Sequence, residues 1–175
     1  LYMIDNITIR RPLPSDGSRL FDLVAQCPPL DGNSMYCNLL QCTHFADTGA
    51  AAEQRGKLVG FISGYLIPQR PDTLFIWQVA VSSSVRGRGL ATRMINHIIN
   101  RATCRHVKWL ETTITQSNDA SWALFKRIAG NLQTTLRQSL LFDDQTHFNG
   151  RHASELLARI GPFSHQQQRV FGNAR

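Results

Sequence analysis

The sequence predicts one α/β domain, a mixed, mostly antiparallel sheet of six to seven strands flanked by helices. Three observations predict it. Segments with the period of a strand alternate along the chain with segments of helical period. A strand, a helix and a strand follow one another over residues 73–114, the pattern of a right-handed crossover between two parallel strands. The 175 residues contain no repeat or long linker, so a single domain is expected over residues 1–163, with a tail over residues 164–175.

In the N-terminal half, alternation of apolar and polar residues predicts a first strand at residues 7–10. Ser15 with Asp16 is expected to cap the next helix, because short polar side chains accept hydrogen bonds from the first free amides. The Pro28–Pro29 pair ends that helix. A turn over residues 30–36 then leads into a short second helix.

A β-hairpin is expected next. Residues 50–54 and 57–66 have strand-like composition and flank the turn residues Arg55–Gly56. Another strand at residues 73–81 runs into a polar loop that contains two glycines. Residues 90–100 then carry the apolar spacing of an amphipathic helix, so this loop is predicted to join a strand to a helix start.

The C-terminal half is predicted to hold a strand at residues 107–114, a helix at 118–128, a weak strand at 132–140 and a last strand at 155–160. The end of the chain after residue 163 lacks apolar periodicity. It is therefore expected to be a mobile tail.

The composition, 42% hydrophobic and 18% charged, is that of an ordinary soluble globular domain. No apolar run approaches the ~20 residues needed to span a bilayer, and no signal-like segment opens the chain. The four cysteines lack C-x-x-C spacing. They are expected to be reduced thiols in a cytoplasmic protein, without a metal.

The formal net charge is +7. A positive chain attracts anionic ligands, which suits a substrate carrying several phosphates. The Lys and Arg residues are scattered rather than clustered on one element, and no array of stacking aromatic residues accompanies them. Nucleic-acid binding therefore stays an alternative that this pattern does not favour.

The loop between the strand 73–81 and the helix 90–100 is the most informative feature. A helix start leaves backbone N–H groups without partners, and the helix dipole favours an anion there. Gly87 and Gly89 let the backbone approach such an anion or adopt positive φ, and Arg86 and Arg88 add positive charge. The glycine spacing is neither that of a P-loop nor that of a dinucleotide fingerprint. We therefore expect a phosphate-bearing ligand of another class; an Arg-Gly surface turn that touches RNA is the alternative.

The motif Arg86-x-x-Gly89-x-Ala91, placed directly after a Val-Ala-Val strand end and before a helix, resembles the pyrophosphate-binding motif of the GNAT superfamily of N-acetyltransferases. The resemblance implies the GNAT fold, in which acetyl-CoA binds where two parallel strands splay apart. That place agrees with the general rule that ligands of such sheets bind beyond the carboxyl ends of the strands.

Five further segments narrow the resemblance: residues 30–40, 45–48, 64–81, 109–113 and 159–163. From about residue 7 to residue 163 the chain resembles the L-2,4-diaminobutyrate acetyltransferases, the acetylating enzymes of ectoine synthesis. This family implies acetyl transfer from acetyl-CoA to the γ-amine of diaminobutyrate, by direct attack in a ternary complex. It also implies a homodimer.

The resemblance implies two cofactor-binding segments. The first comprises Val79, Ala80, Val81, Arg86, Gly87, Arg88, Gly89, Leu90 and Ala91. The second comprises Asn118, Ser121 and Phe125. Many members of the superfamily have, where Phe125 stands, a tyrosine that protonates the leaving thiolate. Phe125 cannot do so; Tyr36 or Ser121 replaces it, or no acid is needed, since a thiolate is a tolerable leaving group.

A diamino acid substrate needs carboxylates near its amines and a donor for its own carboxylate. The candidate substrate-binding residues are Asp31, Asn33, Tyr36, Trp77, His152 and Glu155. Glu111 is the candidate base, directly or through water, because a carboxylate facing inward from a central strand is costly without a task. The structural alternatives are a turn-forming Asp31, a core Trp77, a Glu111 on a solvated face and polar residues at a strand start for His152 and Glu155.

Two further classes of function stay open besides transfer to diaminobutyrate. The enzyme acetylates another small amine, such as an aminoglycoside or a polyamine, or the domain is a regulatory module that binds acetyl-CoA without catalysis. Asp31, Glu111 and Glu155, in a chain with only 12 acidic residues, speak against the regulatory module.

Overall fold

The computed structural model describes residues 6–164, which fall into two compact units. The first unit comprises residues 6–65 and 76–105, and the second comprises residues 66–75 and 106–164. The expected tail lies outside the described residues from residue 165 onward. Within residues 6–164, no helix is both long and apolar enough to cross a membrane.

Within residues 6–164, seven strands form one mixed sheet in the order β1-β2-β3-β4-β5-β7-β6. They are β1 Ile7–Arg10, β2 Ala50–Gln54, β3 Lys57–Ile67, β4 Arg70–Val81, β5 Trp109–Thr115, β6 Leu136–Phe142 and β7 Glu155–Ile160. Four α-helices are described: α1 Asp16–Ala25, α2 Met35–Thr43, α3 Leu90–Ile99 and α4 Asp119–Asn131. Short 3₁₀ helices lie at η1 Ala46–Thr48, η2 Ser83–Val85 and η3 Ala102–Cys104.

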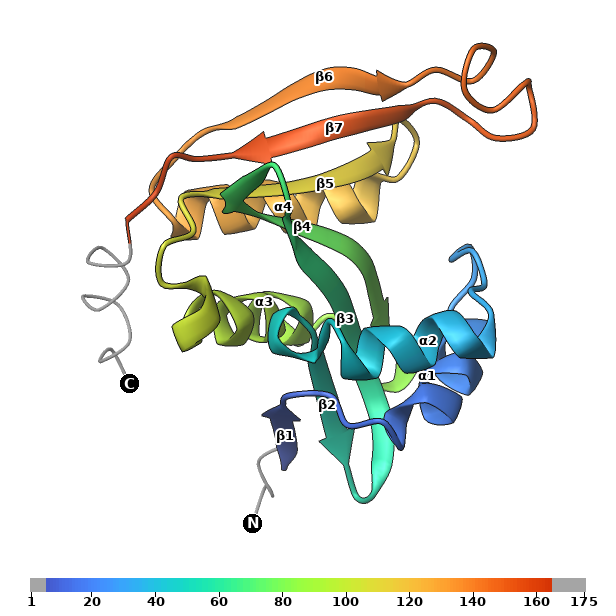
Figure 1. Ribbon diagram of the computed structural model, residues 1–175. Coiled ribbons are helices and arrows are strands. Elements are labelled where there is room, and N and C mark those ends of the chain that lie inside the picture. Colours follow the sequence, from blue (N-terminus) through green and yellow to red (C-terminus); the bar gives the residue numbers. More distant parts are fainter. Residues whose placement is uncertain (1–5, 165–175) are drawn as a thin grey trace. The chain divides into compact units, whose positions relative to one another are not determined.

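In the first unit, β1, β2 and β3 are antiparallel, and α1 packs against α2 (Figure 1). Leu20 and Leu23 of α1 share a buried cluster with Cys42 of α2 and with Phe61 of β3. On α3, the apolar residues repeat at helical spacing, and Leu90, Met94, Ile95, Ile98 and Ile99 are all buried. Gly60 permits close packing here, because a Cβ on it would meet the Met94 sulfur at 3.0 Å.

In the second unit, β4 and β5 pair in parallel over three residues of each strand, from Thr73 opposite Trp109 to Phe75 opposite Glu111. Strand β5 then pairs with β7, and β7 with β6, both antiparallel. Leu110 and Ile114 of β5 are buried. Because side chains alternate between the faces of a strand, Glu111 points to the opposite face from these two, together with its cross-strand partner Arg159.

The predicted elements are present, with small changes at their ends. The hairpin of β2 and β3 turns through Arg55 and Gly56, with φ of 50° and 75°. The last strand begins and ends as predicted. Strand β6 starts later than expected because Gln133 adopts a φ of 53° and the Thr134 N–H donates to the Ala129 carbonyl, which closes the end of α4.

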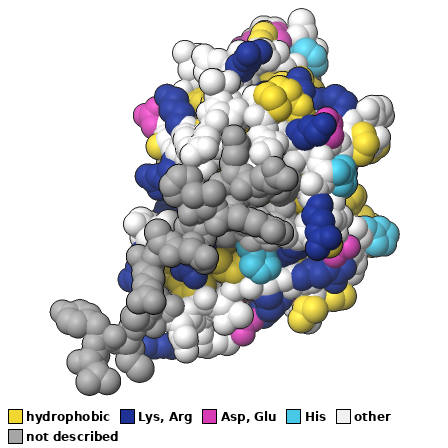
Figure 2. Space-filling view, turned by 90° about the vertical axis from the view of Figure 1, so that its left-hand side faces the viewer, with side chains coloured by type: hydrophobic (Ala, Val, Ile, Leu, Met, Phe, Trp, Pro, Cys, Tyr) yellow, Lys and Arg dark blue, Asp and Glu magenta, His cyan; other side chains and the backbone are white. Residues whose placement is uncertain are grey.

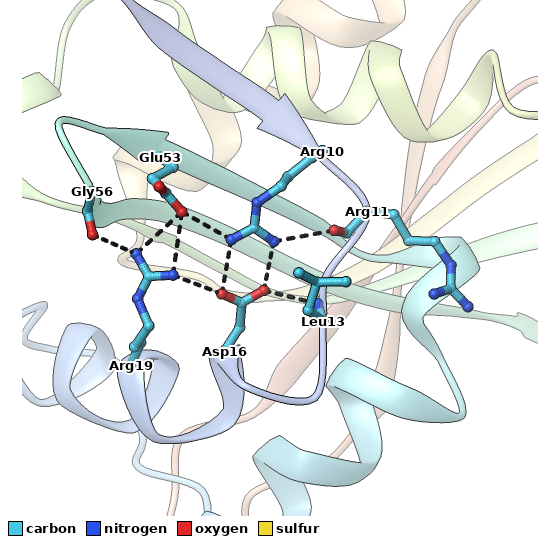
Figure 3. Close-up of polar contacts among 7 residues, drawn as sticks. All are labelled: Arg10, Arg11, Leu13, Asp16, Arg19, Glu53 and Gly56. Atoms are coloured by element: carbon cyan, nitrogen blue, oxygen red, sulfur yellow. Dashed lines mark hydrogen bonds and ion pairs between the residues drawn. The ribbon is translucent and has the colours of Figure 1, made fainter.

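Ser15 stands at the N-cap of α1, but the expected cap is wrong in its contacts, because the Ser15 side chain makes no capping hydrogen bond. Asp16 does not bind a free helix amide either: its carboxylate accepts a hydrogen bond from the Leu13 N–H, in the segment before the helix, at 2.8 Å (Figure 3). It also accepts two hydrogen bonds from Arg10, at 2.7 and 2.9 Å, and one from Arg19 at 3.0 Å. The Asp16 side chain is fully buried, so these contacts fix the start of α1 to β1.

Figure 2 shows one face of the molecule, on which Lys and Arg side chains lie at many separate places among uncharged ones. Acidic side chains are fewer on this face and stand singly. The excess positive charge is thus distributed rather than gathered into one patch on this face.

Candidate functional site

The loop between β4 and α3 has the geometry of an anion-binding helix start. Gly87 and Gly89 adopt φ of 77° and 70°, and Gly89 is the N-cap of α3. A Cβ at either glycine would meet no atom within 4 Å, so backbone conformation rather than space requires glycine here. The Arg93 N–H donates to the Gly89 carbonyl at 3.1 Å, which leaves the amides of the preceding helix turn outside the helical pattern.

Two side chains support this loop. Arg86 donates from Nε to the Val81 carbonyl at 3.0 Å, which ties the loop to the end of β4, while the residue itself is exposed. In the first turn of α3, the hydroxyl of Thr92 is buried and has no hydrogen-bond partner among the described residues. A hydroxyl beside free helix amides is well placed to contact a phosphate.

The end of β4 packs against the hydrophobic core of the first unit through one face of the strand. Ala80 is buried in the cluster of Leu20 and Phe61, and Val79 and Val81 are half-buried. The Val81 carbonyl accepts from the Cys27 thiol at 3.4 Å. The residues that the sequence predicts to bind the pantetheine arm are therefore held in place by contacts with α1 and with Cys27, which follows that helix.

The first unit also holds four of the candidate acceptor-site residues. Gln78 of β4 donates to the Asp31 carbonyl at 2.9 Å and accepts from the Asn33 amide at 3.3 Å. These bonds hold the loop that precedes α2 against β4. Tyr36, in the first turn of α2, is 70% exposed, and Trp77 of β4 is 48% exposed, so Trp77 is not a core residue.

In the second unit, Glu111 is the centre of an ionic cluster. Its side chain is only 2% exposed, and its two oxygens accept hydrogen bonds from Arg70 at 2.6 and 2.9 Å. These hydrogen bonds are the main reason why the pKa of Arg70 is raised. Arg159 adds a second guanidinium, with Nε 3.3 Å from Oε1 and with its central carbon 4.0 Å above the Trp109 ring.

His152 and Glu155 come together at the start of β7. The His152 Nδ1 lies 2.7 Å from the Ala153 carbonyl, which can only accept, so this nitrogen carries a proton. The other ring nitrogen lies 3.9 Å from Glu155 Oε1. Glu155 pairs with Thr115, whereas Glu111 pairs with Arg159, so Glu155 and Glu111 stand four positions apart along the ladder, roughly 13 Å.

The start of α4 uses its predicted residues structurally. Asn118 is the N-cap, and its side-chain oxygen accepts from the Ser121 N–H at 3.1 Å. Ser121 is half-buried. Phe125 is buried with Trp122 and Ile128 on the apolar face of the helix. Among these three predicted cofactor residues, only Asn118 and Ser121 keep polar atoms near the helix start.

Comparison with known proteins identifies the family. The sequence profile of the acetyltransferase (GNAT) family matches residues 18–130. The chain is 51% identical over 157 residues to the L-2,4-diaminobutyric acid acetyltransferase of Methylotuvimicrobium alcaliphilum, covering 90% of this chain and 91% of the relative. The chain belongs to the L-2,4-diaminobutyric acid acetyltransferase family of GNAT enzymes. The corresponding enzyme of Vibrio parahaemolyticus is 50% identical over 151 residues, which cover 86% of this chain and 83% of that protein.

Solved structures agree with this assignment. The chain is similar, with a TM-score of 0.87 and 38% identity, to the diaminobutyrate acetyltransferase of Paenibacillus lautus in complex with L-2,4-diaminobutyric acid and coenzyme A. The match covers 91% of this chain and 97% of that one. The ribosomal-protein-S18-alanine N-acetyltransferase of Escherichia coli, at 15% identity and a TM-score of 0.70 over 90% and 94% of the chains, shares the fold. The predicted GNAT fold, with its parallel pair of β4 and β5, is confirmed.

Four residues of this GNAT enzyme escaped the sequence reasoning: Gln78, Arg70, Arg159 and Thr92. Gln78 is a polar residue with apolar neighbours on both sides in β4, which is the local signal that it carries, whereas Arg70 stands at the start of the strand close to Asp72 and Thr73. Their partners are distant in sequence, so spacing alone does not reveal them. Among the described residues, no group of three His, Cys, Asp or Glu side chains is arranged to hold a metal ion.

Proposed function

We propose that this enzyme transfers an acetyl group from acetyl-CoA to the γ-amine of L-2,4-diaminobutyrate, giving the N4-acetyl product used for ectoine synthesis. The observation that carries the proposal is the likeness to the P. lautus enzyme, which was solved with both diaminobutyric acid and coenzyme A and matches 91% of this chain. The 51% identity to a curated diaminobutyric acid acetyltransferase supports the same substrate.

The loop Arg86–Ala91 is proposed to hold the pyrophosphate of acetyl-CoA. The amides around Gly87 and Gly89 would donate to phosphate oxygens, and the start of α3 favours the negative charge. Backbone groups of Val79, Ala80 and Val81 would hold the pantetheine arm and polarise the thioester carbonyl. Asn118, Ser121 and Phe125 are proposed as the second cofactor segment, with Phe125 contributing through the packing of α4.

Asp31, Asn33, Tyr36 and Trp77 of the first unit, and His152 and Glu155 of the second, are proposed to bind the amino acid. His152 offers the lone pair of Nε2 when its ring is neutral, because Nδ1 is committed to the Ala153 carbonyl. This nitrogen and Glu155 Oε1 are two acceptors 3.9 Å apart, a spacing that suits an ammonium group donating to both. An exposed indole such as Trp77 can in turn meet a cation or pack on a methylene chain.

The reaction requires a neutral amine. Its nitrogen attacks the thioester carbonyl carbon, the new C–N bond forms, the C–S bond breaks, and the amine loses one proton while the thiolate gains one. We propose that Glu111 receives the amine proton through water. Both of its oxygens are already held by Arg70, so a direct approach would have to displace one of these hydrogen bonds. Tyr36, whose side chain is exposed, is the proposed donor to the leaving thiolate.

The activity is tested by following the release of free CoA thiol with L-2,4-diaminobutyrate, ornithine, lysine and a polyamine as acceptors. Diaminobutyrate is expected to give the highest kcat/KM, and NMR of the product is expected to place the acetyl group on the γ-nitrogen. Turnover of a polyamine but not of diaminobutyrate would assign the enzyme to another small amine. Binding of acetyl-CoA without turnover of any acceptor would instead support the regulatory module.

We also propose that the enzyme is a homodimer in the cytoplasm. For the dimer, strand β6 is the last strand of the sheet, and it exposes Leu140, Leu141 and Phe142. An exposed apolar edge strand of this kind can pair with a second copy. For the compartment, all four cysteines are free thiols, which suits a reducing environment. Light scattering at micromolar concentration is expected to give twice the mass of the chain; the mass of one chain would contradict the dimer.

A further inference from the structure

The proposed acceptor carries a carboxylate besides its two amines, and none of the residues assigned above supplies a positive charge to bind it. The ionic cluster of Glu111, Arg70 and Arg159 in the second unit holds such a charge. These three side chains together carry one more positive than negative charge, and a further carboxylate, Asp72, acts on Arg70.

Arg70 alone satisfies the carboxylate. Its two Nη atoms donate to the two oxygens of Glu111 at 2.6 and 2.9 Å, the parallel geometry that suits a guanidinium and a carboxylate best. Arg159 lies within ion-pair distance of the same carboxylate, at 3.3 Å from Nε to Oε1, but the contact lacks hydrogen-bond geometry, and Nε has no hydrogen-bond partner among the described residues.

Arg159 is nevertheless held in one place. Its guanidinium carbon lies 4.0 Å over the Trp109 ring, a cation–π contact that is made through the face of the group and not through its N–H edge. Its side chain is 38% exposed, in contrast to the 2% of Glu111. A planar, oriented guanidinium that keeps its hydrogen-bond donors is the usual receptor for a carboxylate.

The sequence adds an independent observation. Arg70, Glu111 and Arg159 lie in three of the separate segments through which the chain resembles the diaminobutyrate acetyltransferases. The fold brings side chains of these three segments together in one cluster, and none of the three residues lies in the phosphate loop that follows β4. A cluster built from family-specific segments belongs with what is specific to the family, the acceptor, rather than with the cofactor that all GNAT enzymes share.

We infer that Arg159 binds the α-carboxylate of the amino acid acceptor and so makes the enzyme prefer diaminobutyrate to diamines that lack this group. This inference rests on the proposed function. Arg70 neutralises Glu111, which leaves Arg159 available to the substrate, and Trp109 keeps its guanidinium in plane.

The test compares two acceptors that differ only in the carboxylate, L-2,4-diaminobutyrate and 1,3-diaminopropane, with wild type, Arg159→Met and Arg159→Lys. Arg159→Met keeps an unbranched stem over Trp109 but removes the charge. It is expected to lower kcat/KM for diaminobutyrate roughly 10- to 100-fold, the loss typical of one charged hydrogen-bonded contact, and to change kcat/KM for diaminopropane by less than about twofold. Arg159→Lys keeps the positive charge but loses the planar guanidinium with its paired N–H donors. Its kcat/KM for diaminobutyrate is expected to lie between the values of wild type and Arg159→Met.

Arg137→Met is the matched control, because Arg137 is the exposed cross-strand neighbour of Arg159 on β6 and removing it changes the net charge equally. It is expected to leave the ratio of the two kcat/KM values unchanged. If Arg159→Met leaves the ratio of the two kcat/KM values unchanged, whether both values fall equally or neither falls, the inference is overturned and Arg159 is a structural partner of Glu111. If Arg159→Met does not fold, the ratio in Arg159→Lys decides.

The acceptor preference of the wild-type enzyme distinguishes a failure of the proposed function from a failure of the role of Arg159. A wild-type enzyme that prefers diaminopropane to diaminobutyrate overturns both the proposed function and the role of Arg159. A wild type that prefers diaminobutyrate, and whose preference survives in both Arg159 variants, overturns only the latter.

Discussion

Glu111 illustrates how the role of one residue depends on neighbours that are distant in sequence. Its position in an apolar strand predicts a carboxylate with a task, and its burial agrees with that prediction. The neighbours change what the carboxylate can do, because Arg70 and Arg159 hold it as one member of an ionic cluster. Glu111 can therefore act in proton transfer or hold the two arginines in place, and the two roles predict different effects of replacing it.

Glu111→Gln separates these two roles. If Glu111 carries the amine proton through water, kcat is expected to fall roughly 100- to 10,000-fold, because an amide cannot accept the proton. Steady-state kinetics, with the melting temperature of the same samples, measure the effects on catalysis and on stability. A lower melting temperature with kcat retained would assign Glu111 to the ionic cluster alone.

Gly89→Asp tests the phosphate loop at the residue scale. Aspartate tolerates positive φ better than most side chains, and a Cβ at this position meets no atom within 4 Å, so the fold is expected to survive. The added negative charge at the start of α3 is expected to weaken acetyl-CoA binding by about 1–2 kcal/mol, close to tenfold, as measured by calorimetry.

Gly89→Asn is the control for this change, since asparagine has the same shape and tolerance of positive φ but no charge. It is expected to bind acetyl-CoA several-fold more tightly than Gly89→Asp. Equal affinities for the two variants and wild type would show that the helix start does not contact the phosphates.

At the scale of elements, the start of α1 depends on a polar network that joins three segments (Figure 3). Arg10 of β1 and Arg19 of α1 both contact Asp16, and both also contact Glu53 of β2. Burial by itself would raise the pKa of Asp16, but the hydrogen bonds from Arg10 and from the Leu13 N–H outweigh burial and lower the pKa. The network therefore stabilises the fold only while Asp16 is ionised.

Asp16→Asn is expected to lower the free energy of unfolding at pH 7 by about 3 kcal/mol, because it removes one partner of a buried ion pair. Since the pKa of Asp16 is depressed in the folded state, its contribution is complete above the unfolded value of about 4 and is lost as the pH falls below it. Urea unfolding at pH 7 and pH 3 measures this, and the gap between wild type and variant should shrink at the lower pH.

Glu53→Gln provides the comparison within the same network. The Glu53 side chain is 30% exposed, so its loss is expected to cost less than that of the fully buried Asp16. A larger loss in Glu53→Gln than in Asp16→Asn would contradict the assignment of Asp16 as the centre of the network.

At the scale of the whole molecule, the chain carries a net charge of +7, and on the face that Figure 2 shows Lys and Arg side chains stand at several places. Such a field raises the local concentration of an anion with several charges and is screened by salt. Raising NaCl from about 0.05 to 0.5 M is therefore expected to increase the KM for acetyl-CoA several-fold, well beyond the change in KM for diaminobutyrate. A salt response equal for both substrates would contradict steering of the cofactor.

Sequence reasoning succeeded where the signal is local. The hairpin at Arg55–Gly56, the amphipathic α3 and the loop with Gly87 and Gly89 were all predicted, because each depends on side-chain periodicity or on backbone conformations that glycine favours. At the start of α1 the position of the N-cap, Ser15, is predicted, but the capping hydrogen bond is not made. The carboxylate of Asp16 is bound instead by Arg10, which reaches it from the preceding strand.

The sequence by itself determined the order of strands and helices, the phosphate loop and the resemblance to one acetyltransferase family, since short-range patterns encode all three. Only the tertiary structure decided which side chains meet. It placed two arginines on Glu111, paired His152 with Glu155 and showed Gln78 holding the loop before α2. The reason is that such contacts join segments tens of residues apart, and their distances depend on how the strands pair and not on any local spacing.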